Sequence, residues 1–148
     1  MSTTGASRIR EKIIERRGIE LIRKLDGLEA GAVVRSSDYD LSWHTAIVKE
    51  NSKFESTPAL RIPIEKSAEI IYSKFCEFLE KYSEDVLIQF ELPYVLRVKI
   101  KNKMNFIRSL YERQKTKDLT IFKVQPDVVF EVQELEYEIK LFLISKSF

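Results

Sequence analysis

The sequence of 148 residues contains one cysteine, one histidine, four glycines and four prolines. The single cysteine, Cys76, excludes an intrachain disulfide framework and any zinc site built from several thiolates. Gly5, Gly18, Gly27 and Gly31 are too scattered to form a glycine-rich phosphate loop, which argues against a nucleotide-dependent enzyme. We therefore expect neither a cofactor nor a metal site.

Long apolar segments are also absent. No run of about 18 uncharged apolar residues occurs, so no segment is suited to span a membrane. The first residues are polar and are followed by closely spaced arginine and lysine residues, unlike a secretory signal. We expect a cytoplasmic protein without a membrane partner.

Charged residues are plentiful but unevenly distributed. Lys and Arg together number 25 and Asp and Glu 23, which gives a net charge of +2. Residues 97–117 carry eight basic residues and one acid, whereas residues 65–91 carry seven acids and three lysines. Residues 127–138 carry five acids and no basic residue. With 44% hydrophobic residues, the composition predicts one folded domain over residues 1–148.

Three segments have the apolar spacing of amphipathic helices: residues 8–28, 65–82 and 103–114. Asn102 is placed to cap the third helix through its side chain. Apolar alternation predicts seven strands, over residues 32–35, 41–48, 85–90, 94–101, 119–124, 128–132 and 135–144.

Short connections between the last three strands favour an antiparallel meander. The sequence therefore predicts an α+β domain in which two or three helices pack on a mostly antiparallel sheet. Residues 1–7 are expected to form a flexible arm and residues 49–63 a long loop. The last strand is apolar on both faces, so we expect it to be central in the sheet or covered by a second copy, as in a homodimer.

His44 and Cys76 are the residues to consider for nucleophilic catalysis. His44 lies within the predicted strand 41–48, where a Ser-His-Asp arrangement would require Ser42 together with Asp38 or Asp40. The spacing gives no support for that geometry, and aspartates of this kind are common in turns. Cys76 lies in the middle of a predicted helix, where a free cysteine usually packs as a small apolar side chain.

A metal-dependent nuclease is a further alternative. Pro126-Asp127 followed by Glu138-Ile139-Lys140 resembles the PD…(D/E)xK pattern of restriction-endonuclease-like nucleases. The resemblance implies that Asp127 and Glu138 would hold a divalent metal while Lys140 helps to activate water. We expect a hairpin that turns near residues 133–134 and places Asp127 opposite the other two. The chain ends soon after Lys140, before the helix and strand that follow in such nucleases.

The basic segment 97–117 gives a second alternative, binding of nucleic acid. Eight cations within 21 residues would attract phosphate groups and make binding dependent on salt. These residues are Arg97, Lys99, Lys101, Lys103, Arg108, Arg113, Lys115 and Lys117. Aromatic residues between them fall on predicted apolar faces, which favours core packing over base stacking.

Because no catalytic cluster or cofactor motif stands out, the leading hypothesis is a non-enzymatic protein-interaction module. Segregated charge is typical of proteins that recognise a specific partner. One form of this hypothesis is a toxin-neutralising protein of the immunity or antitoxin kind, which would insert acids into a basic cleft. The acids expected to do so are Glu131, Glu134, Glu136 and Glu138.

Overall fold

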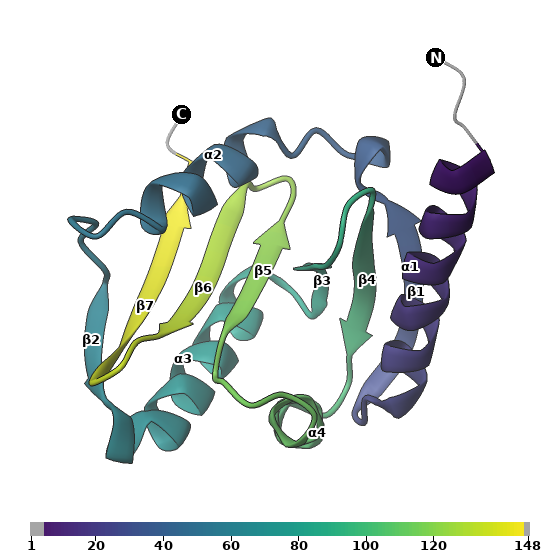
Figure 1. The fold of residues 1–148 in the computed structure, drawn as a ribbon. Helices are drawn as coiled ribbons and strands as arrows, with labels where there is room; N and C mark the ends of the chain where they lie inside the picture. Colours follow the sequence, from purple (N-terminus) through teal and green to yellow (C-terminus); the bar gives the residue numbers. More distant parts are fainter. Residues whose placement is uncertain (1–4, 147–148) are drawn as a thin grey trace.

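The computed structural model describes residues 5–146, which form four α-helices, two short 3-10 helices and one seven-stranded sheet (Figure 1). The helices are α1 (Gly5–Lys24), α2 (Ser42–Asn51), α3 (Ser67–Tyr82) and α4 (Lys103–Glu112), with η1 (Ser36–Asp38) and η2 (Ile64–Lys66). The strands are β1 (Leu28–Arg35), β2 (Leu60–Pro63), β3 (Asp85–Gln89), β4 (Tyr94–Ile100), β5 (Leu119–Lys123), β6 (Val128–Glu134) and β7 (Glu138–Ser145). No helix in this part of the chain is long and apolar enough to cross a membrane.

The sheet has the strand order β1-β4-β3-β5-β6-β7-β2, and all neighbours are antiparallel. The predicted α+β class and the C-terminal meander β5-β6-β7 are confirmed. Strand β7 lies between β6 and β2, and both Leu141 and Phe142 are buried within the chain. The first half of β7, which β2 flanks as far as Leu141, is therefore internal to the sheet, whereas Leu143 beyond it is 40% exposed.

One face of the sheet is covered by α1, α3 and α4. Phe75 of α3 stacks on Phe106 of α4 with 5.7 Å between ring centroids, and both rings are fully buried. Helix α1 can approach the sheet closely because residue 18 is glycine: a Cβ atom there would lie 2.8 Å from Cγ2 of Val33 in β1. This face holds most of the apolar core.

The opposite face is covered in part by α2, which crosses over the ends of β6 and β7 in Figure 1. The predicted strand over residues 41–48 is wrong, since Ser42–Asn51 is helical. Trp43, Ile47 and Val48 share one helical side and pack against a smaller apolar cluster that includes Phe122 and Val129. In so short a segment, residues four positions apart such as Trp43 and Ile47 share a face in a strand and in a helix, so the pattern fits both.

Several predicted boundaries also differ. Residues 5–7 belong to α1, while residues 1–4 of the expected arm lie outside the described residues. Within the expected loop 49–63, the first three residues complete α2 and the last four form β2, so the connection comprises residues 52–59. The last strand begins at Glu138 because residues 135–137 form the turn.

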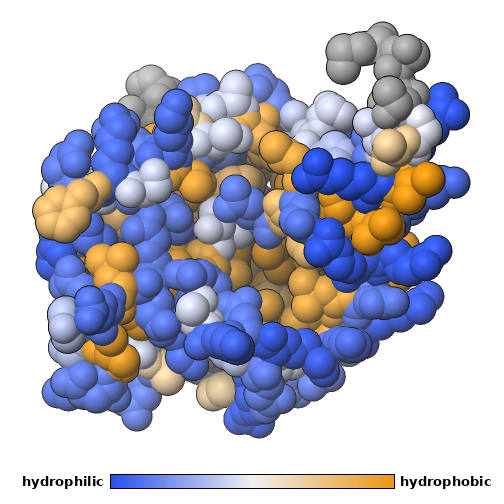
Figure 2. All heavy atoms as spheres, viewed as in Figure 1, coloured by the Kyte–Doolittle hydropathy of each residue, from blue (hydrophilic) through white to orange (hydrophobic). Residues whose placement is uncertain are grey.

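The pairing of β3 with β5 is short, joining Leu87 with Phe122 and Ile88 with Ile121. Beyond these pairs the strands diverge beside a cavity of about 330 Å³ lined by residues of α1, β3, β4, α4 and β5. Figure 2 shows an apolar hollow near the centre of the view, where β3 and β5 part in Figure 1.

Candidate functional site

The β6–β7 hairpin separates the three residues of the nuclease-like pattern. Gln133 pairs with Lys140 near the turn, whereas Val128 pairs with Ser145 at the far end. The backbone carbonyl of Asp127 accepts a hydrogen bond from the amide of Lys146. The expected juxtaposition is wrong because the start of one hairpin strand always faces the end of the other. The described residues contain no group of three or more His, Cys, Asp or Glu that could hold a metal ion.

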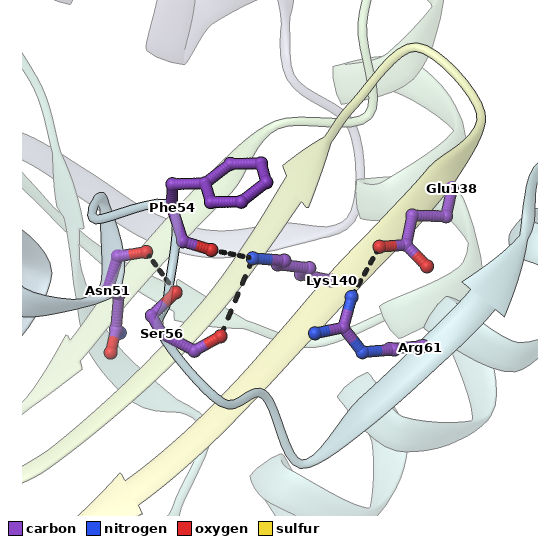
Figure 3. Close-up of polar contacts among 6 residues, drawn as sticks. All are labelled: Asn51, Phe54, Ser56, Arg61, Glu138 and Lys140. Carbon is purple, nitrogen blue, oxygen red and sulfur yellow. Dashed lines mark hydrogen bonds and ion pairs between the residues drawn. The ribbon is translucent and has the colours of Figure 1, made fainter.

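Lys140 instead holds a surface loop. Its side chain is only 5% exposed, and Nζ donates to the backbone carbonyls of Phe54 at 3.3 Å and Ser56 at 3.5 Å (Figure 3). On the same strand, Glu138 forms an ion pair with Arg61 of β2. The lysine of the pattern therefore binds backbone oxygens of the connection between α2 and β2.

Glu131 of β6 is also buried. Its carboxylate accepts hydrogen bonds from Nδ2 of Asn51 at 2.9 Å and Nε2 of Gln133 at 3.2 Å. Burial raises the pKa of Glu131, and the two amide hydrogen bonds oppose that effect. A partner cannot reach this carboxylate directly. Of the other acids in the expected plug, Glu134 and Glu138 are half-buried and Glu136 is exposed.

Asn51 connects these two buried groups to the loop. Its backbone carbonyl accepts from Ser56 Oγ at 2.9 Å and from Gln133 Nε2 at 3.0 Å. The loop backbone over residues 51–56 is thus held by polar side chains from β6, β7 and the loop itself. We call this set of contacts, made by Asn51, Ser56, Glu131, Gln133 and Lys140, the loop anchor.

The loop anchor supports one prominent side chain. Phe54 is 96% exposed, although its own carbonyl is bound by buried Lys140 (Figure 3). Charged residues flank it in the chain, where Lys53 pairs with Glu50 at 2.9 Å. An exposed aromatic ring with charged residues next to it in the chain has the composition of an interface centre with a polar rim.

The basic residues of segment 97–117 do not share one surface. Arg97 and Lys99 lie on the face of β4 away from α4, where they form ion pairs with Asp85 at 3.8 Å and Glu29 at 3.3 Å. Strand alternation causes this placement, since Leu96, Val98 and Ile100 face the helices.

The remaining cations lie on α4 or at its ends. Lys103 pairs with Glu80 at 3.6 Å, and Nε of Arg113 donates to the carbonyl of Lys24 at 3.2 Å. Nζ of Lys117 lies 4.5 Å from the centre of the Tyr111 ring. Lys101, Arg108 and Lys115 are exposed. The sheet stands between the two groups, so the expected basic stripe is split.

His44 is fully buried on α2. Its Nε2 lies 2.8 Å from the carbonyl oxygen of Lys123 and 3.5 Å from Oδ1 of Asp127, so this nitrogen carries the proton. Its Nδ1 has no hydrogen-bond partner among the residues described. Ser42 donates its hydroxyl to Asp40 at 2.7 Å rather than to His44. The Ser-His arrangement considered above is therefore not formed.

The site residues that sequence reasoning missed are Asn51 and Phe54. Both lie in segment 49–63, where polar residues and two prolines indicated only a loop. The fold and this anchored loop define an α+β protein with an exposed aromatic group on a fixed support. No protein-family model, no curated protein and no solved structure matches the chain.

Proposed function

We propose that this protein is a non-enzymatic protein-interaction module that binds a partner protein through the loop carrying Phe54. The observation that supports the proposal is the contrast between the fixed backbone of that loop and its exposed ring. Lys140 is buried beneath the loop and bound to two of its carbonyls, while the Phe54 side chain is 96% exposed.

Burial of an ammonium group costs several kcal/mol unless other polar groups replace its water. At Lys140 the replacements are carbonyls of residues 54 and 56, so the buried charge orders this loop. A fixed loop loses less conformational entropy on binding than a mobile one. Aromatic residues are also enriched among those that dominate binding energy at protein interfaces.

The partner should present an apolar pocket with charged groups of both signs at its edge. This surface differs from the acidic plug expected above, because Glu131 is buried and Glu138 is paired with Arg61. A toxin-neutralising role would then depend on Phe54 entering the toxin, with Glu136 and other exposed acids at the edge of the contact.

Affinity capture from a lysate of the source organism, carried out with and without nuclease treatment, tests the proposal. We expect one stoichiometric protein to be retained by the wild type, and about tenfold or more weaker retention by Phe54→Ala. Leu92→Ala is the matched control, because Leu92 is 78% exposed on the turn between β3 and β4. Equal retention by Phe54→Ala, or capture that depends on nucleic acid, would contradict this function.

A further inference from the structure

Helix α1 has apolar residues on two opposite sides. Ile14 and Gly18 are buried against the sheet, four residues apart on one side. Ile9 and Ile13 are also four residues apart, but they are 62% and 51% exposed. At 3.6 residues per turn, the pair Ile9 and Ile13 points away from the side that packs on the sheet. We call this pair the outer pair of α1.

The surroundings of the outer pair are basic. Arg10, Lys12 and Arg16 lie within one turn of it and are exposed. Among the residues described, none of these three takes part in an ion pair, whereas Arg17 pairs with Glu91 at 2.8 Å. The outward side of α1 is therefore an apolar pair with unneutralised cations beside it.

A groove between α3 and α4 is the complementary feature. The start of α4 meets the end of α3, where Lys103 pairs with Glu80, and the two helices cross at a steep angle in Figure 1. They touch through Phe75 and Phe106 and leave a cavity of about 470 Å³ on their outer side. Its apolar lining comprises Ala68, Tyr72, Met104, Ile107 and Tyr111. We call it the α3–α4 groove.

The edge of the groove can receive cations. Glu69 and Glu112 lie there, and neither takes part in an ion pair among the residues described. Two cations line the same edge: Lys117 lies over the ring of Tyr111, and Arg108 lies one turn from Glu112 on α4, so Glu69 is the carboxylate that would receive a cation of α1. Acids also predominate over lysines in residues 65–91, which include α3.

We propose that a second copy of this chain places its outer pair of α1 in the α3–α4 groove. The occupant is a helix with an apolar pair and flanking cations, and the groove provides apolar walls and carboxylates. A third helix packed in the groove between two crossing helices buries apolar surface of all three. With two-fold symmetry, each copy gives one helix and receives one, so the assembly closes as a dimer.

The oligomeric state tests this proposal without an unidentified ligand. Light scattering of the wild type from about 5 to about 500 µM should show a dimer that dissociates on dilution. Ile9→Glu with Ile13→Glu should weaken dimerisation by about tenfold or more, because each isoleucine loses its burial. Met104→Lys should do the same from the groove side. Leu92→Glu is the matched control and should leave the dimer intact.

Mixing the two variants gives the decisive result. The α1 variant keeps an intact groove, and Met104→Lys keeps an intact outer pair, so their mixture restores one of the two contacts and should form a heterodimer. Circular dichroism confirms that each variant is folded, as expected for substitutions at exposed residues. A monomeric wild type, a dimer insensitive to either variant, or a mixture that stays monomeric would each overturn the proposal. Phe54→Ala should leave the dimer unchanged, which separates this interface from the proposed partner site.

Discussion

The two faces of the sheet are stabilised in different ways. The face under α1, α3 and α4 is a continuous apolar core that includes Phe75, Phe106 and Phe130. The face under α2 has a smaller apolar cluster and, beside it, the buried charged residues Glu131 and Lys140. Apolar burial is non-directional, whereas hydrogen bonds fix the positions of the groups they join. The second face therefore specifies the position of a loop more than it stabilises the fold.

The largest expected effect is on the helical face. Phe75→Ala should lower the free energy of unfolding by about 3–5 kcal/mol, because it removes a fully buried ring between Phe106 and Phe130. Phe54→Ala is the matched control and should change it by less than about 0.5 kcal/mol, because Phe54 is exposed. Denaturation in guanidinium chloride measures both. Similar losses in the two variants would contradict the assignment of the core to this face.

Asn51→Ala tests the loop anchor and should have a smaller effect. It leaves the buried carboxylate of Glu131 without one of its two donors, at a cost of about 1–3 kcal/mol. The control is Ser52→Ala, which removes an exposed hydrogen bond to the carbonyl of Lys49 and should cost less than about 0.5 kcal/mol. Equal stability of the two variants would mean that the anchor contributes nothing.

The helical face was largely predictable from the sequence. Residues 65–82 repeat apolar positions every three or four residues over several turns, and only a helix satisfies that spacing. Asn102 was also assigned correctly, since its side chain accepts from the amide of Asn105 at 3.0 Å. Such features depend on residues close together in the chain.

The other face was not predictable in the same way. Residues 41–48 are too few to distinguish a period of two from a period of 3.6, so α2 was taken for a strand. The loop anchor joins Asn51 to Glu131 and Phe54 to Lys140, pairs separated by 80 and 86 residues. Their contact depends on β2 crossing to the far edge of the sheet, for which no local pattern exists.

Glu131→Gln should change how stability depends on pH. Because burial raises the folded-state pKa of Glu131 above 4.5, the folded protein takes up this proton first as the pH falls. Protonation of Glu131 therefore favours folding below pH 4.5, and that contribution is lost as the pH rises through the folded-state pKa. The free energy of unfolding of Glu131→Gln, relative to that of the wild type, should therefore increase as the pH rises from about 4 to about 7. Glu136→Gln, at an exposed position, should show no such trend.

The smallest effect on global stability is expected for Lys140→Met, which keeps most of the side-chain volume and removes the ammonium group. The variant no longer buries a charge, and the two carbonyls that lose their donor belong to a surface loop where water can bind them, so we expect a change within about 1 kcal/mol. Amide hydrogen exchange in the loop should change more than the global stability does. The amides of Lys53 and Ser56, which bond to carbonyls within or next to the loop, should exchange about fivefold faster.

Lys49→Met is the control for that measurement, because Lys49 is exposed on α2 and should leave amide exchange in the loop unchanged. Faster exchange in Lys140→Met but not in Lys49→Met would mean that the buried lysine fixes the position of Phe54. Unchanged exchange together with a large loss of global stability would make Lys140 a core residue like Phe75. The distinction between the two faces, and the proposed function with it, would then lose its main support.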